Sequence, residues 1–233
     1  MGSGIILHRI NKKPTSGTKS LEEYTWAEIS AFSTSGIAAD HLSVGDTKTV
    51  VVDGVSRLVR LIGFDHFESD PYESYAGTVF EFVEPLDDLY AFDTGGTTNW
   101  TSSSLRTTLN NTFFPTLPDD LQDVIVPVYP WAVRDGNGVA AQCKVFILSV
   151  LEYGKDSDSI YDAERNHCTA VAYYADGGTP PWMALTGDED TIMTRSAVNT
   201  EDWAAVTTYD NTNRAVQWSV SYTSSYICPC FCV

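Results

Sequence analysis

Long apolar runs and basic residues are both scarce in this chain of 233 residues. No apolar stretch approaches the roughly 20 residues that cross a bilayer as a helix. The N-terminus lacks a basic region followed by a long apolar stretch, so we expect neither membrane insertion nor a secretory signal peptide. The 14 basic residues stand against 31 acidic ones, a net charge of −17. Because such a protein repels phosphates, we expect no nucleic acid partner.

Paired cysteines and clustered histidines, the usual ligands of zinc, are absent as well. The five cysteines are an odd number, and Cys228, Cys230 and Cys232 alternate along the last residues. Alternating positions of one strand share a face and do not pair easily with one another. We therefore predict reduced, buried thiols in a protein that folds in a cytoplasm.

Two closely spaced acids suggest a calcium site, although we expect the protein to have no cofactor. Asp188 and Asp190 lie in a Gly-Asp-Glu-Asp segment, and Ca²⁺ prefers carboxylate oxygens. The ordered ligand spacing of an EF-hand is missing, which favours a solvated acidic turn. No serine or cysteine nucleophile has an evident histidine partner. We therefore predict no catalytic residues, no resident metal and no enzymatic activity.

Apolar, aromatic and hydroxyl side chains are what the chain has in abundance. It is 43% hydrophobic, which suffices for a full core, and only 19% charged. The sequence pattern predicts an α+β fold that is β-rich with two or three short helices. The expected helices cover residues 21–32, 101–114 and 118–126, and residues 157–174 are expected to be helical in part. The expected strands cover residues 47–52 and 55–64, joined by an Asp53-Gly54 turn, and then 77–83, 144–151, 191–196, 204–208 and 215–221.

The chain ends on an apolar segment, in which Ile227, Pro229, Phe231 and Val233 alternate with cysteines. Chain termini fray unless the structure holds them. We therefore predict that the C-terminal strand is buried in the sheet, where it forms a hairpin with residues 215–221. The run at 144–151 is continuously apolar, which favours a central strand.

The first 20 residues carry four basic side chains and no acid, whereas the rest of the chain has a net charge of −21. We predict a basic arm at residues 1–20 and one domain at residues 21–233. The arm is a disordered leader or a peptide that docks on another protein. In the docking interpretation its contact residues are Ile5, Ile6, Leu7, Arg9, Lys12 and Lys13.

Residues 207–226 contain four serines, four threonines, three tyrosines and two asparagines. Tyrosine and tryptophan give rigid contact area in binding surfaces, and short polar side chains adapt their hydrogen bonds. We therefore predict a ligand-binding face at residues 199–226. For Trp218 taken alone, a place in the core is the favoured interpretation, and Trp203 could stack on a sugar ring or pack internally. The candidate ligand-binding residues are Trp203, Tyr209, Asn211, Asn213, Arg214, Trp218, Tyr222 and Tyr226.

Several short blocks recur in a recognisable order along residues 24–233. They are Trp26 with Ile29, Val44-Gly45-Asp46-Thr47, Ile62-Gly63-Phe64-Asp65-His66, Thr78-Val79-Phe80-Glu81-Phe82, Trp100, Ser104-Leu105-Arg106, Leu109-Asn110, Leu117-Pro118, Leu121-Gln122, Ile125, Phe146-Ile147-Leu148-Ser149, Glu152, Gly154, Thr194-Arg195-Ser196 and Pro229-Cys230-Phe231-Cys232-Val233. In this order they resemble a large bacterial and phage family of unknown function with a C-type-lectin-like fold, related to the formylglycine-generating-enzyme fold. Tyr226 and Cys228 depart from the glycine and arginine of that family's usual ending.

The resemblance implies a scaffold with stable terminal strands and variable loops. Some proteins of this broad fold are variable proteins of diversity-generating retroelements, displayed on phage or cell surfaces to bind receptors. We therefore expect a binding module on a virion, on tail or capsid, that folds in the host cytoplasm and attaches to a bacterial surface glycan or protein. Bacterial cytoplasm or cell surface is the alternative location.

A second interpretation is a structural decoration or tail-tip protein, which the arm anchors to other virion proteins or to copies of itself as a homo-oligomer. A third, less favoured, is a formylglycine-generating-type oxidase that uses the terminal cysteines. No basic residue neighbours these cysteines in the sequence to lower a thiol pKa, so structural thiols are the favoured interpretation.

Overall fold

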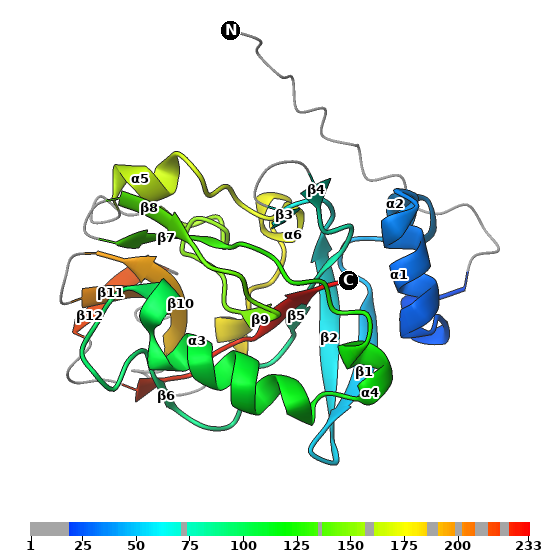
Figure 1. Cartoon of the computed structure of the whole chain (residues 1–233), viewed down its shortest axis with the longest axis horizontal. Coiled ribbons are helices and arrows are strands. Elements are labelled where there is room, and N and C mark those ends of the chain that lie inside the picture. Colours follow the sequence, from blue (N-terminus) through cyan, green and yellow to red (C-terminus); the bar gives the residue numbers. More distant parts are fainter. Residues whose placement is uncertain are drawn as a thin grey trace, which may run out of the picture.

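A computed structural model gives the arrangement of the chain (Figure 1). It describes residues 19–70, 74–134, 137–156, 161–185, 191–198, 202–207, 214–219 and 224–233, with the backbone alone described in 202–207 and 214–219. The arm residues Ile5 to Lys13 and the candidate calcium ligands Asp188 and Asp190 lie outside this part of the chain. The predictions made for them therefore stay predictions.

The C-terminal strand lies inside the main sheet, as the sequence predicts. This antiparallel sheet has the strand order β1-β2-β5-β14-β9. Its strands are β1 Thr47–Val52, β2 Val55–Gly63, β5 Val79–Phe82, β14 Cys230–Cys232 and β9 Val145–Phe146. Strand β14 pairs with β5 on one side and with β9 on the other, and its three residues are fully buried. All five cysteines are free and buried, which confirms the reduced-thiol prediction.

Two predictions about this sheet are wrong. The terminal strand does not form a hairpin with residues 215–221, because β12 (Arg214–Ser219) pairs with β11 (Asp202–Thr207) in a separate sheet. The run at 144–151 is not a central strand, since only its two β-residues pair and they lie at the sheet edge. Residues 147–150 are buried but form no strand, because Arg195 and Ser196 bond their main chain instead. Arg195 donates to the carbonyls of Ile147 and Leu148, and Ser196 Oγ accepts from Val150 N.

The predicted hairpin is confirmed. Strands β1 and β2 pair along their whole shared length, from Val52↔Val55 at the turn outward. Asp53 and Gly54 both have positive φ, at 49° and 80°. This is the geometry of the two-residue turn whose twist matches that of the flanking strands, and an Asp-Gly pair favours it.

The two faces of the main sheet differ in chemistry. Phe80 and Phe231 are cross-strand partners and stack with ring centroids 5.5 Å apart. Trp26 of helix α1 (Trp26–Thr34) packs edge-on against both rings, so α1 covers this apolar face. The opposite face carries the cross-strand pair Arg60 and Glu81, an ion pair away from water.

The predicted helix at 21–32 forms as two segments, because each has its own capping residue. A single turn, η1 (Leu21–Glu23), precedes α1. Thr25 then starts α1 with a capping box, in which its Oγ1 accepts from Glu28 N and the Glu28 carboxylate accepts from Thr25 N. Such reciprocal bonds satisfy main-chain donors that a helix start leaves free.

Gly77 allows α1 to approach the chain before β5. A Cβ atom at this position would lie 2.5 Å from Ser33 Cβ and 2.6 Å from Ser33 Cα. We predict that Gly77→Ala lowers the free energy of unfolding by about 1–3 kcal/mol, since α1 must move outward. Gly63→Ala is the matched control, because its nearest atom would be 3.8 Å away. Urea denaturation compares the two, and equal effects would contradict close packing at Gly77.

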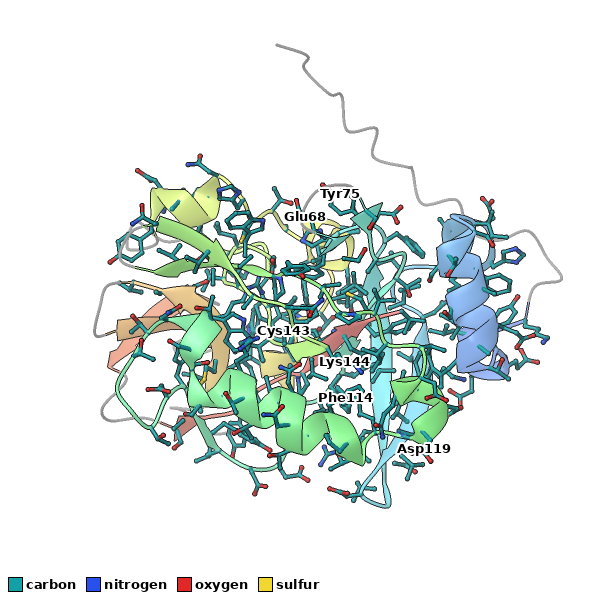
Figure 2. The ribbon with its side chains drawn as sticks, viewed as in Figure 1. Glu68, Tyr75, Phe114, Asp119, Cys143 and Lys144 are labelled. Atoms are coloured by element: carbon teal, nitrogen blue, oxygen red, sulfur yellow. The ribbon has the colours of Figure 1, made fainter. Side chains whose placement is uncertain are left out.

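The predicted helix at 101–114 begins and ends differently from the pattern. Its segments, in order, are η2 (Trp100–Ser102), α3 (Ser104–Thr108), the π-helical turn η3 (Leu109–Phe113) and η4 (Phe114–Thr116). The Asn110 side chain explains the π turn, because it donates to Val145 O and accepts from the Lys144 and Val145 amides. The Lys144 ammonium also lies 4.3 Å from the Phe114 ring centroid (Figure 2).

Short turns make up the remaining helices, which outnumber the two or three that the sequence predicts. Single turns lack the repeated apolar spacing by which helices are recognised. They are α2 (Ala38–His41), α5 (Asp162–Arg165), α6 (Ala172–Ala175) and η5 (Pro181–Ala184). The predicted helix at 118–126 forms as the shorter α4 (Asp119–Gln122), and α5 and α6 lie within the segment 157–174 that is expected to be helical in part. The remaining small strands are β3 (Glu68–Asp70), β4 (Ser74–Tyr75), β6 (Tyr90–Ala91), β7 (Trp131–Arg134), β8 (Asn137–Ala140) and β13 (Ser224–Ser225).

The architecture is thus a β-rich α+β fold with mostly antiparallel sheets, as predicted for the class. None of the helices described is long and apolar enough to cross a membrane. A second sheet, β10 (Thr191–Ala197) with β11 and β12, lies at the end of the molecule opposite α1 (Figure 1). Tyr226 bridges to Ile192 and so ties β10 to the segment that leads into β14.

Candidate functional site

The register of β11 and β12 brings three candidate ligand-binding residues onto one face of the second sheet. Trp203 pairs directly with Trp218, and Thr207 pairs directly with Arg214. Direct partners share a face, and so do residues two apart along a strand. The positions of Trp203, Arg214 and Trp218 therefore lie together, and Gln217 lies on the opposite face. We call this the β11–β12 face.

The other candidate ligand-binding residues do not all fall in the described part of the chain. Tyr209, Asn211, Asn213 and Tyr222 lie outside it. Tyr226 is within it, half-buried, and packs against the hydrophobic core. Its main chain also bonds β10, since its amide donates to Thr191 O and its carbonyl accepts from Met193 N. The backbone of Tyr226 therefore supports the second sheet.

A fully buried arginine anchors this sheet to the body of the protein. Arg195, on β10, donates from Nε to Trp131 O and from Nη1 to Ile147 O, each at 2.7 Å. Its guanidinium also forms an ion pair with the Glu152 carboxylate. One side chain thus joins β10, the start of β7 and the apolar segment after β9. Arg195 is therefore a hydrogen-bonding core residue whose donors satisfy loop carbonyls.

Glu152 is held in place by its own turn. Its Oε2 accepts from Ser149 N at 2.9 Å, and its amide donates to Ser149 Oγ at 3.2 Å. The Phe67 ring lies 5.7 Å from the Arg195 guanidinium carbon and closes another side. Because the ion pair is dry and its hydrogen bonds are directed, it fixes one relative position of the joined segments.

Ser196 connects the same strand to helix α5. Its hydroxyl donates to Glu164 Oε1 at 2.6 Å and accepts from Val150 N at 2.9 Å. The second carboxylate oxygen, Glu164 Oε2, is buried and has no hydrogen-bond partner among the described residues. Burial raises the pKa of Glu164 to about 7, despite the opposing effects of the Ser196 bond and of Arg195. Near neutral pH, this buried carboxyl therefore exchanges a proton.

An aromatic pair lies beside this anchor. Trp131, at the start of β7, stacks on His167 with ring centroids 3.8 Å apart and an angle of 9° between the planes. Gly138 on β8 leaves room for both rings, since a Cβ there would lie 3.2 Å from each. The ring of Trp131 is half-buried and His167 is exposed. Strand β7 contacts β10, so the pair adjoins the second sheet.

Sequence reasoning missed Trp131, Glu152, Glu164 and His167. Glu152 stood only in a block of the family resemblance, and the others carry no spacing signal at all. Their partners in this network are 32 to 64 residues away in the chain, as in the contacts Arg195 to Trp131 and Ser196 to Glu164. Pairings over such distances are set by the fold and leave no local pattern.

The cysteine thiols are poorly suited to nucleophilic or redox chemistry. Burial raises the pKa of Cys228, Cys230 and Cys232 well above that of a free thiol. Glu81, close to the first two, raises their pKa further. A thiolate is the reactive form of cysteine, so these environments disfavour reaction. Among the described residues no group of three or more histidine, cysteine or acidic side chains could hold a metal ion.

A second buried network lies on the other side of the main sheet. Glu81 forms an ion pair with Arg60 and accepts from the hydroxyls of Tyr153 and Tyr174. The Arg60 guanidinium carbon lies 4.0 Å from the Tyr173 ring centroid. Burial raises the pKa of Glu81 in spite of these partners. Glu81 and its partners Arg60, Tyr153 and Tyr174 are all buried, so we assign this network a structural role.

The chain belongs to the family described as "Domain of unknown function (DUF6273)", whose model matches residues 86–233. The match spans the helix α3 region, the Arg195 network, the second sheet and the terminal strand. It starts after β1, β2 and β5, so it is shorter than the resemblance over residues 24–233. No curated protein and no solved structure matches the chain.

Proposed function

We propose that the protein is a non-enzymatic binding module that recognises a ligand on a bacterial surface through the β11–β12 face. The observation that carries this proposal is the register that brings Trp203, Arg214 and Trp218 onto one side of the sheet. Tryptophan and arginine are the side chains that most often dominate binding energy at interfaces. The remaining tyrosine and asparagine candidates lie between these two strands or shortly after them in the sequence.

A rigid support strengthens the proposal. Strand β10 is buried along its whole length, and Arg195 and Ser196 bond it to three other parts of the chain. Binding faces on rigid elements lose less conformational entropy when the ligand binds. The fold is accordingly proposed to be C-type-lectin-like, with β10 as the frame and the chain around β11 and β12 as the recognition surface. Display on a phage virion is the proposed setting.

Alanine substitutions on the two sides of β12 test the proposed face. Binding of the purified protein to envelope fractions from a panel of bacteria is measured by surface plasmon resonance. Trp218→Ala and Arg214→Ala are each expected to weaken binding by about tenfold or more, as expected for central contact residues. Gln217→Ala, on the opposite face, is expected to change it by less than about twofold. Equal affinities for all three variants would contradict the proposal, provided that their melting temperatures agree.

The ligand class follows from treated envelope fractions. A tryptophan pair suits the stacking of sugar rings, so we propose a surface glycan as the first candidate. Periodate oxidation of the fraction is then expected to abolish binding, whereas protease digestion leaves it intact. The reverse result would identify a surface protein as the ligand. Fractions that never bind the native protein would contradict the recognition role itself.

A further inference from the structure

A groove opens at the end of the molecule opposite the β11–β12 face. It encloses about 480 Å³, within the size range of small ligand clefts. Three elements line it, namely the η1–α1 segment, the outer strand β1 and the turn at α4. Three carboxylates, of Glu22, Glu23 and Asp120, belong to its walls. Asp119, which precedes Asp120 on α4 and is labelled in Figure 2, is not part of the lining.

The groove runs along the outer edge of the main sheet, where η1 already bonds one position. Strand β1 is the outermost strand of the main sheet. Thr49 N donates to Glu22 Oε2 at 2.6 Å, so the main-chain groups of Thr49 point away from β2. Main-chain groups alternate in direction along an antiparallel strand, and those of Thr47 and Val51 therefore also face the groove side. A strand added beside this edge pairs with the main-chain groups of Thr47 and Val51, and it displaces the Glu22 carboxylate from the Thr49 amide.

The charge of the groove is negative. Lys48 is the only basic residue in its lining, and its ammonium donates to the carbonyls of Glu22 and Tyr24. Three carboxylates thus stand against one ammonium. Apolar surface accompanies them at Val51, which is half exposed, whereas Tyr24 and Trp26 line the floor and are themselves buried. A suitable occupant is therefore an extended segment with both basic and apolar side chains.

Residues 1–18 of this chain have that composition. They contain Arg9, Lys12 and Lys13, the apolar run Ile5-Ile6-Leu7, and no acid. The segment ends only four residues before Glu22, which is in the groove wall. Ten extended residues reach roughly 33–36 Å, so the segment is long enough to lie along the six residues of β1. Such a short tether also gives a high effective concentration.

We propose that this N-terminal segment docks in the groove of its own chain, as an added strand beside β1 with its basic side chains on the acidic walls. The basic arm is then a part of the fold that covers an edge strand. This docking is independent of the proposed recognition face.

Hydrogen exchange of the full-length protein tests the docking. The Val51 amide is expected to exchange slowly in the native chain. It is expected to exchange at least about tenfold faster in the triple variant Arg9→Glu/Lys12→Glu/Lys13→Glu, because each acidic wall would repel the segment. Asp120→Lys is expected to have a similar effect. Combining Asp120→Lys with the triple variant is expected to restore part of the protection.

Asp119→Lys is the matched control. It places the same charge on the same turn of α4 but outside the groove, so Val51 exchange is expected to stay within about twofold of native. Equal exchange in the native, triple and Asp120→Lys proteins would overturn the proposal. Protection that grows with protein concentration would also overturn it, because the occupant would then be the segment of a second copy. Melting temperatures of all variants confirm that the domain remains folded.

Discussion

Arg195→Met is expected to remove about 3–5 kcal/mol from the free energy of unfolding. The substitution keeps an apolar side chain of similar length but leaves the buried Glu152 carboxylate without its cation. It also removes the donors that satisfy the carbonyls of Trp131 and Ile147. Since the free energy of unfolding of a native protein is only about 5–15 kcal/mol, a loss of this size can unfold much of the protein. Urea denaturation followed by tryptophan fluorescence measures it.

Arg165→Met is the control for Arg195→Met. Arg165 also bonds acids, Asp156 and Asp162, but these carboxylates are mostly exposed. Exposed ion pairs contribute about 0–1 kcal/mol to stability, so this variant is expected to unfold at nearly the same urea concentration as the native protein. The double variant Arg195→Met/Glu152→Leu is expected to recover part of the loss, because no charge is left unpaired. A loss below about 1 kcal/mol for Arg195→Met would contradict the anchoring role.

Glu164→Gln is expected to change how stability depends on pH. Burial raises the pKa of this carboxyl from 4.5 to about 7 in the folded protein. The folded state therefore prefers the protonated form, and that preference stabilises the protein fully below pH 4.5. This contribution is lost as the pH rises through 7. The difference in pKa corresponds to about 3.5 kcal/mol at most, since one pKa unit is about 1.4 kcal/mol.

Because glutamine stays neutral, Glu164→Gln is expected to unfold at higher urea than the native protein at pH 8, with little difference at pH 4.5. Its Oε1 still accepts from Ser196. Glu28→Gln is a control with the opposite sign. The Thr25 amide and Lys19 lower the pKa of Glu28 to about 2, so its charged form stabilises the protein above pH 4.5. A Glu164→Gln curve parallel to the native one from pH 4.5 to 8 would contradict the proton exchange.

Local features of the fold could be predicted from the sequence. The Asp53-Gly54 pair specifies its hairpin turn, because few residues accept two successive positive φ angles. The apolar alternation of the last residues correctly indicates a buried terminal strand, and it follows that the cysteines on it are reduced. The strands at 191–196 and 204–208 are also confirmed, as β10 and β11. In each case the signal lies within a few neighbouring residues.

Pairings between distant segments could not be predicted in this way. An apolar strand such as β14 has no mark that distinguishes β5 and β9 from the closer β12 as neighbours. The run at 144–151 is apolar because it is buried, and a buried segment is apolar whether its main chain bonds to strands or to side chains. The sequence therefore does not distinguish it from a central strand. The site depends on the same kind of information. Trp203 and Trp218 were separate candidates in the sequence, and only the register of β11 and β12 joins them.

Radical footprinting of Trp203 and Trp218 tests most directly whether the β11–β12 face recognises a ligand. Hydroxyl radicals oxidise exposed tryptophan rings, and mass spectrometry locates the modified residue. We expect both rings to be oxidised in the free protein and protected when a binding envelope fraction is present, with Trp182, a fully buried ring, unmodified throughout. If Trp203 and Trp218 resist oxidation in the free native protein as Trp182 does, they are interior residues and the face cannot bind a ligand.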